Sequence, residues 1–375
     1  MNPFAPRLLR RRDLIRGMGS LACAGCDVRA PASEPLWASA QGADEGTFEL
    51  VVAGPNGVVA RFASEVRGHG LATHPAVPTR VVMFGRRPQR AGLVADLERG
   101  VLGTFSSPTG RHHVGHGCFD ADASRLLVAE ADDVTGDGTI AVLDAQSLER
   151  IDEFDTHGIG PHEIVLLPDG ETLAIANGGL ITAPGGRDPI NLDTMQSSLT
   201  HVDVATGALR STFAVPESKA SIRHLAVGED GAVVAVMQIQ RDALDDRDPR
   251  PLIAVQQPGE ALVPLDDGLE LGTAMLDYAG GVALDELTRT AAVTSPRGNL
   301  VAYWNVDTGR LVGTNRFDDV SGVTVSSDRT RFVLTGSSGQ VRHTDVETLD
   351  ERPEERQQLD VRWDNHLRAL PLERA

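Results

Sequence analysis

Short, nearly unbroken apolar runs recur along the chain. A strand with one solvent-exposed face alternates apolar and polar residues, whereas a strand covered on both faces is apolar almost throughout. Five runs of the second kind occupy residues 80–84, 125–129, 172–176, 232–236 and 331–335. The pattern therefore predicts a buried strand in each of several repeated units.

A second apolar segment follows these runs and ends in an acidic or amide residue and a polar turn. Residues 138–145, 198–207 and 300–309 share this plan, and the last two close on Thr-Gly. Asp side chains accept hydrogen bonds from the turn backbone, and Gly tolerates the positive φ that tight turns need. Each segment is predicted to be the third strand of a four-stranded unit, followed by a hairpin.

The repeat length identifies the architecture. Innermost strands are predicted to begin near His69, His116, His162, His224, Gly281, Gly322 and His366. Successive positions are 47, 46, 62, 57, 41 and 44 residues apart, and steps of about 40–50 residues are typical of propeller blades. The two longest steps contain polar insertions near 181–197 and 241–251, which we expect to be loops on one face.

These repeats predict an all-β, seven-bladed β-propeller of the quinoprotein, YVTN and WD40-like type. Six blades are complete, and the last inner strand, residues 365–370, lacks companions at the C-terminal end. Residues 48–53 and 57–62 can supply them, so one blade is shared between the N- and C-terminal segments and closes the ring. The prediction is a single domain over residues 47–370, followed by a short tail, 371–375.

Composition agrees with this fold and excludes some functions. Aromatic residues make up only 4% of the chain, whereas there are 39 Gly and 21 Pro, as expected for many short strands joined by turns. The formal charge of −18 argues against nucleic-acid binding, which needs a basic footprint. The three cysteines, Cys23, Cys26 and Cys118, do not suggest a disulfide framework, and Cys118 is expected to be a small buried apolar residue.

The first forty residues have the character of an export signal. Arg7, Arg10, Arg11 and Arg12 precede a modest apolar stretch, and the run from Arg11 to Arg16 resembles a twin-arginine motif. Two processing sites are possible: after Ala38-Ser39-Ala40, or before Cys26, which would then carry a lipid. No later stretch is long and apolar enough to span a membrane. We therefore expect a periplasmic protein, attached to the membrane through a lipid only in the alternative where processing occurs before Cys26.

Five histidines fall at the equivalent inner-strand position. They are His69, His116, His162, His224 and His366. Since inner strands line the channel of a propeller, these imidazoles should face one another at one channel mouth, where they could bind a transition metal such as iron or copper. Further donors or supporting groups nearby are His74, His112, His113, Glu163 and Asp364. Alternatively, the histidines only bond loop carbonyls and connect the blades. No closely spaced histidine pair indicates a particular metal.

Several motifs together resemble one known family. They are Arg67-Gly68-His69-Gly70-Leu71-Ala72-Thr73-His74-Pro75, Gly110-Arg111-His112, Gly115-His116-Gly117, Gly158-Ile159-Gly160-Pro161-His162-Glu163, Ala176-Asn177-Gly178-Gly179, Ser221-Ile222-Arg223-His224-Leu225-Ala226, Tyr278-Ala279-Gly280-Gly281-Val282-Ala283, Thr294-Ser295-Pro296-Arg297-Gly298 and Trp363-Asp364-Asn365-His366. The chain resembles the bacterial domain-of-unknown-function family 1513 over about residues 47–370. This resemblance implies an exported propeller whose genes lie near those of imelysin-like lipoproteins and a dihaem cytochrome-like protein, and hence a link to metal acquisition. Gly281 and Gly322 stand where an unbroken histidine ring would need ligands.

Three functional hypotheses follow. The first is a periplasmic, non-catalytic binding module for iron or another metal, which presents it to an imelysin-like or cytochrome-like partner. The second is a metal-dependent oxidoreductase or hydrolase that uses the same channel mouth, although the fold by itself does not establish an activity. The third is a protein-interaction scaffold whose histidines are structural. An enzyme should keep an open coordination position beside an acid or base, whereas a scaffold should show an apolar patch on a blade face.

Overall fold

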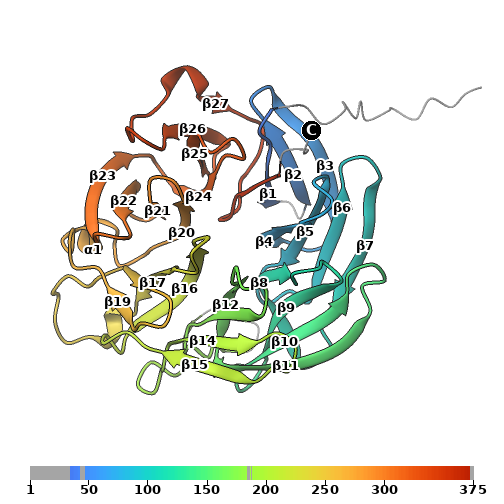
Figure 1. Ribbon diagram of the computed structural model, residues 1–375, viewed down its shortest axis with the longest axis horizontal. Helices are drawn as coiled ribbons and strands as arrows, with labels where there is room; N and C mark the ends of the chain where they lie inside the picture. The colour runs from blue at the N-terminus through green and yellow to red at the C-terminus, as the bar shows by residue number, and fades with distance from the viewer. Residues whose placement is uncertain (1–33, 43–46, 184–185, 187, 372–375) are drawn as a thin grey trace, which may run out of the picture.

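Seven antiparallel four-stranded sheets surround a central axis in the computed structural model, which describes residues 34–42, 47–183, 186 and 188–371. Figure 1 shows the sheets as the blades of one closed ring. The predicted seven-bladed propeller is therefore confirmed. Each predicted apolar run forms the second strand of its blade, where neighbouring blades cover both faces.

Three blades come from residues 68–213. In each, the first strand named is innermost. The strands are β4 (Gly68–Thr73), β5 (Arg80–Gly85), β6 (Ala91–Asp96) and β7 (Gly100–Ser106); β8 (Arg111–Phe119), β9 (Arg125–Asp132), β10 (Asp137–Asp144) and β11 (Arg150–Ile159); and β12 (Pro161–Leu166), β13 (Thr172–Asn177), β14 (Ser198–Asp203) and β15 (Leu209–Phe213).

Three further blades follow in the same order. They are β16 (Ala220–Val227), β17 (Val233–Ile239), β18 (Ile253–Gln256) and β19 (Leu262–Pro264); β20 (Gly281–Asp285), β21 (Thr290–Ser295), β22 (Leu300–Asn305) and β23 (Arg310–Arg316); and β24 (Val320–Val325), β25 (Arg331–Gly336), β26 (Gln340–Asp345) and β27 (Gln357–Gln358). Helical segments in the described part of the chain are α1 (Leu271–Ala274) and two 3-10 turns, Arg241–Ala243 and Pro353–Glu355. None of these is long and apolar enough to cross a membrane.

The closing blade combines both ends of the chain. Its order is β28 (Arg368–Ala369), β1 (Trp37–Gly42), β2 (Phe48–Gly54) and β3 (Gly57–Ser64), so the blade is shared as predicted. In Figure 1 its blue strands lie beside the red C-terminal segment. The structure differs from the prediction by one additional strand, β1. This strand lies between β28 and β2, with Trp37 opposite Ala369 and Ala38 opposite Arg368.

The expected start of the domain at residue 47 is therefore too late. Trp37, Ala38, Ser39 and Ala40 are all buried. The small residues that resemble a signal-peptidase site are small because they pack between blades, where Ala38 and Ala40 join a cluster with Met83. Cleavage after Ala40 would cut through β1. Cys26 and the arginine-rich segment lie outside the described residues, so the export signal stays a prediction.

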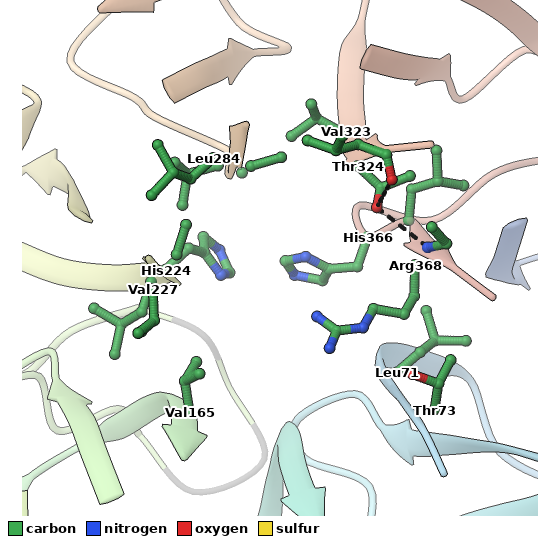
Figure 2. A pocket seen from close by; sticks show the side chains of 18 of the residues that line it. Leu71, Thr73, Val165, His224, Val227, Leu284, Val323, Thr324, His366 and Arg368 are labelled. Carbon is green, nitrogen blue, oxygen red and sulfur yellow. Dashed lines mark hydrogen bonds between the residues drawn. The ribbon is translucent and has the colours of Figure 1, made fainter. Parts of the chain in front are cut away.

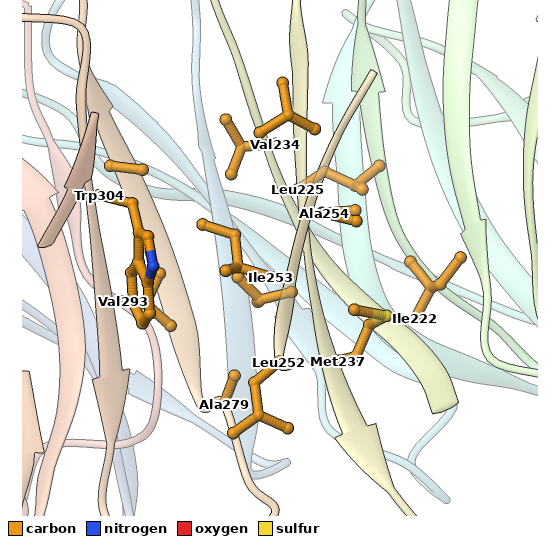
Figure 3. Packing of buried hydrophobic residues seen from close by; sticks show 14 of the residues in the cluster. Ile222, Leu225, Val234, Met237, Leu252, Ile253, Ala254, Ala279, Val293 and Trp304 are labelled. Atoms are coloured by element: carbon orange, nitrogen blue, oxygen red, sulfur yellow. The ribbon is translucent and has the colours of Figure 1, made fainter. Parts of the chain in front are cut away.

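Apolar packing between neighbouring blades forms the core. Figure 3 shows one such interface, where Ile253 of one blade faces Val293 and Trp304 of the next. Trp304 also donates its indole N–H to the carbonyl of Asp267 at 2.8 Å. Because every blade packs on two others, the ring holds the innermost strands in fixed positions around the axis. Cys118 is half-buried, and burial raises the pKa of its thiol to about 12, which keeps it protonated.

Candidate metal centre

Irregular pairing of the innermost strands coincides with the predicted histidines. The register between inner and second strands shifts around His69 in β4, around His116 in β8, around His162 in β12 and just before His224 in β16. A bulge of this kind bends a strand and redirects a side chain. His69 and His162 are second in their strands, as expected, whereas His116 and His224 lie further along and His366 precedes β28.

The five imidazoles meet at the axis and form one closed group, which we call the histidine cluster. Its members are His69, His116, His162, His224 and His366. Going round the ring from His366, neighbouring ring centroids are 4.4, 5.1, 4.9, 4.7 and 4.5 Å apart. The ring closes although the blades of β20 and β24 contribute no histidine, because the imidazoles of His224 and His366 reach each other directly.

Glycines allow the strands to approach this closely. A Cβ on Gly70 would lie 2.5 Å from the carbonyl oxygen of Gly115 and 2.7 Å from His116 Nδ1. A Cβ on Gly115, whose φ is +103°, would lie 2.5 Å from His69 Cδ2. A side chain at either position would push β4 away from β8, and the cluster depends on both glycines for this reason.

Asp364 supports one side of the cluster. Its buried carboxylate lies 3.3 Å from His69 Nδ1 and accepts hydrogen bonds from Arg67 Nε at 2.8 Å and Arg86 Nη1 at 3.0 Å. Burial alone would raise the pKa of Asp364, but the hydrogen bond and charge of His69, with the charges of Arg86 and Arg67, hold it well below its usual range. Asp364 is therefore ionised and orients the His69 ring.

Glu163 supports the opposite side. One carboxylate oxygen accepts the backbone N–H of Leu225 at 2.9 Å and lies 3.2 Å from His224 Nδ1, while the other lies 3.8 Å from His116 Nδ1. Burial raises the pKa of Glu163 to about 7. The predicted supporting positions of Glu163 and Asp364 thus agree with their contacts in the structure, one on each side of the histidines.

Burial keeps four of the five imidazoles neutral. Burial, followed by the charges of neighbouring histidines and Arg223, places the pKa values of His116, His162 and His224 well below the ordinary value, and burial with His69 and His224 does the same for His366. Neutral imidazole is the form that binds metals. His366 Nε2 lies 3.2 Å from His69 Nε2, and His116 Nε2 is buried with no hydrogen-bond partner among the described residues.

Two triads have the spacing that a metal needs. The ligand atoms of His69, His116 and His366 lie within 4.8 Å of one another, as do those of His116, His162 and His224. A metal about 2.0–2.1 Å from each imidazole nitrogen keeps its ligands about 4 Å apart or closer, so small ring rotations would complete either site. His116 belongs to both triads. The donor set therefore fits a nitrogen-preferring transition metal.

Three of the predicted accessory histidines lie elsewhere. His74 follows β4 at the end remote from His69 and packs against Phe119, with ring centroids 4.8 Å apart. His112 Nδ1 lies 2.8 Å from Asp133, and the ring of His113 packs against Phe105 at 5.4 Å. They precede the β8 bulge or follow the end of β4, so the structure does not bring them to the axis with the other predicted residues.

A cavity of about 890 Å³ adjoins the cluster. His116, His224 and His366 line its inner end, and it continues along the innermost strands toward residues such as Glu229, Glu286 and Arg329. Figure 2 shows His224 and His366 facing each other across it, with Arg368 beside His366. The insertions near 181–197 and 241–251 join second to third strands, so they begin at the histidine end of the blades, opposite this opening.

Sequence reasoning missed several residues that complete the site. Arg67 and Arg86 hold Asp364, and Arg368 extends into the cavity. Of these, Arg368 had a usable signal, because it lies two residues beyond His366 and alternate residues of a strand share a face. The pairing of Arg67 and Arg86 with Asp364 had no sequence signal, because it depends on contacts across the blade that closes the ring.

Fold and geometry together define a seven-bladed β-propeller with a five-histidine channel site. The chain belongs to the DUF1513 family, whose description is "Protein of unknown function", and residues 63–370 match the family model. Among solved structures, the chain is similar to Kuenenia stuttgartiensis hydrazine synthase at 17% identity and a TM-score of 0.61, over 82% of this chain and 94% of that one. That likeness shows the fold alone. No curated protein matches the chain.

Proposed function

We propose that this protein is a binding module that holds a transition-metal ion in the histidine cluster. The observation that carries the proposal is the meeting of five imidazoles from five blades, with centroids of ring neighbours 4.4–5.1 Å apart. Two of them have a carboxylate at 3.2–3.3 Å from Nδ1. A carboxylate on one ring nitrogen fixes the tautomer that leaves the other nitrogen free to bind a metal.

The alternative is that the histidines only connect the blades. Structural histidines satisfy their ring nitrogens with carbonyls or hydroxyls, because a buried unsatisfied nitrogen costs about 1–3 kcal/mol. The rings in this cluster contact one another and Glu163 and Asp364, and His116 Nε2 has no partner in the described structure. One bound ion would satisfy several of these nitrogens at once, which favours metal binding over a purely structural role.

The ligand set selects a group of metals rather than one ion. Imidazole suits zinc, copper, iron and nickel. Among the divalent ions of these metals, a given nitrogen site binds copper most strongly. Iron or copper remains the expectation from sequence. We further propose that the protein acts in metal acquisition in the periplasm with an imelysin-like or cytochrome-like partner. This part rests on the family resemblance and on the arginine-rich N-terminal segment.

A second candidate is a metal-dependent oxidoreductase or hydrolase. The observation in its favour is that His116, His224 and His366 line the cavity together with Glu163. His116 belongs to both triads with metal spacing, so an ion in either triad would lie beside the cavity and next to the Glu163 carboxylate, where a coordination position could stay open. Turnover of any substrate by the loaded protein, lost on Glu163→Gln with the metal retained, would favour this candidate over a binding module.

The test of the primary proposal is metal content. Untagged protein, a His116→Ala/His162→Ala variant and a control His112→Ala/His157→Ala variant would be purified in parallel and measured by mass spectrometry. We expect near-stoichiometric metal, bound on purification or after loading, in the wild type and the control, and at least a tenfold loss in the cluster variant. Circular dichroism would verify that all three are folded. Equal metal in both variants, or none in folded wild type after loading, would overturn the proposal.

A further inference from the structure

Apolar side chains line the cavity beyond the histidine cluster. Leu71, Val165, Val227, Leu284 and Val323 surround it in Figure 2. The first four are only half-buried, so they present apolar surface to a space of about 890 Å³. Sites for small organic ligands are concave, largely apolar and about 300–1,000 Å³ in volume. This part of the wall therefore offers apolar contacts to the body of a small molecule, beside the polar groups that line the rest of the cavity.

The acidic groups at the far end of this cavity already have partners. Glu229 pairs with Arg329 at 2.5 Å, and Glu286 pairs with Arg289 at 2.9 Å. Asp285 accepts the backbone N–H and the hydroxyl of Thr288, both at 2.8 Å. These contacts offset or occupy the carboxylates, so the rim presents paired charges rather than an open anionic surface.

Arg368 differs from these rim residues. It belongs to β28, it is exposed, and Figure 2 shows its guanidinium pointing into the cavity between His366 and Leu71. Within the described ranges of the chain, no carboxylate forms an ion pair with it, whereas the arginines at the rim are paired. Its positive charge acts to lower the pKa of the nearby Glu163, and no hydrogen bond joins the two side chains in the described structure. The cavity thus holds a cationic group available to a ligand.

We propose that this cavity binds a small organic carboxylate, with its carboxylate on Arg368 and its apolar body against Leu71, Val165, Val227 and Leu284. A guanidinium recognises a carboxylate through two parallel hydrogen bonds. The carboxylate end then lies beside His366, at the inner end of the cavity. This inference goes beyond metal binding and does not require it, although such a ligand would lie next to an ion in the cluster.

The probe is 2-naphthoate, with 2-naphthamide as its neutral counterpart and octanoate as a second carboxylate of different shape. Binding would be measured by calorimetry on chelator-treated protein, so that coordination to a metal cannot contribute. Three proteins would be compared: wild type, Arg368→Gln, and Arg310→Gln as a control. Arg310 is 73% exposed on the outer strand β23 and pairs with Asp267, so its replacement changes the net charge equally and leaves the cavity intact.

We expect saturable binding of at least one carboxylate to wild type and to Arg310→Gln, and at least a tenfold weakening by Arg368→Gln. The amide should bind weakly and equally to all three. Failure of both carboxylates to bind folded wild type, or equal binding to Arg368→Gln, would overturn the inference. Metal content of Arg368→Gln, measured separately, should equal that of wild type, so failure of the metal proposal and failure of this one are distinguishable.

Discussion

The hydroxyl of Ser39 donates a 2.6 Å hydrogen bond to the backbone carbonyl of His366, 327 residues away in sequence. Ser39 is fully buried in β1, and His366 is a member of the histidine cluster. The strand that closes the ring therefore also fixes the backbone of one candidate ligand. Closure of the propeller and assembly of the site are the same structural event at this position.

Loss of this hydrogen bond should affect both stability and metal binding. Ser39→Ala leaves the partly buried His366 carbonyl without this donor, and we expect a loss of about 1–2 kcal/mol in the free energy of unfolding. Metal affinity should fall about tenfold, as is typical when a group that orients a ligand is removed. The matched control is Ser64→Ala, whose hydroxyl donates to the backbone carbonyl of the nearby Val66 and accepts from its N–H. Denaturant melts and metal titrations would check both effects, and a Ser39→Ala protein that matches this control in both would contradict them.

Truncation separates the two possible starts of the mature domain. A chain that begins at residue 34 keeps β1, whereas one that begins at residue 41 loses Trp37 and Ala40, which are 1% and 0% exposed. Removal of a buried Trp side chain alone costs about 3–5 kcal/mol. We expect the shorter chain to melt at a much lower temperature or to be insoluble.

Thermal melts of the two chains side by side would measure this difference. If the chain starting at residue 41 proves as stable as the longer one, β1 is dispensable, and processing after Ala40 becomes compatible with the fold.

The close contact between β4 and β8 can be tested by adding one methyl group at Gly115. Gly115 and Gly57 have similar backbone angles, φ of +103° and +110°, but a Cβ at Gly57 meets nothing within 4 Å. Gly57→Ala therefore carries only the backbone cost, roughly 1 kcal/mol. Gly115→Ala adds a clash with the His69 ring, and we expect a further loss of at least about 2 kcal/mol together with loss of metal binding. Equal stabilities of the two variants in urea would show that the approach of the strands is not tight.

Acid should destabilise the protein through buried neutral histidines outside the cluster. The side chain of His343 is 3% exposed, and its pKa is lowered to about 4, chiefly by burial. Because the folded pKa lies below the unfolded value of about 6.5, the unfolded chain binds a proton first, and stability falls as the pH decreases from about 6.5 to about 4. At pH 4.5 this group costs about 2–3 kcal/mol relative to neutral pH.

His343→Phe removes that titration. The variant should lose less stability than wild type between about pH 7.5 and 4.5, by about 2–3 kcal/mol, as measured by urea unfolding at each pH. Parallel pH profiles for the two proteins would mean that His343 does not stay neutral in the folded state.

Local patterns predicted most of the fold, because each blade repeats the same apolar second strand and the same turn. They did not predict β1. A run of small residues such as Ala38, Ser39 and Ala40 is expected both in a strand packed between blades and at a signal-peptidase site, so the sequence pattern does not distinguish the two. The five histidines could be predicted since they occupy equivalent places in the repeat. His112 and His113 were not excluded from sequence, although Gly115, a glycine inside the strand, marks the bulge in β8 that separates them from His116. Arg86 and Ser39 contribute through contacts that exist only after the ring closes.

X-ray absorption spectroscopy of the metal-loaded protein tests the central claim most directly, because it reports the ligands of the ion itself. We predict at least three imidazole nitrogens at about 2.0–2.1 Å, with a reduced imidazole count in the His116→Ala/His162→Ala variant or no bound ion to measure. A first shell made only of oxygen atoms, or an imidazole count unchanged in that variant, would contradict metal binding by the histidine cluster.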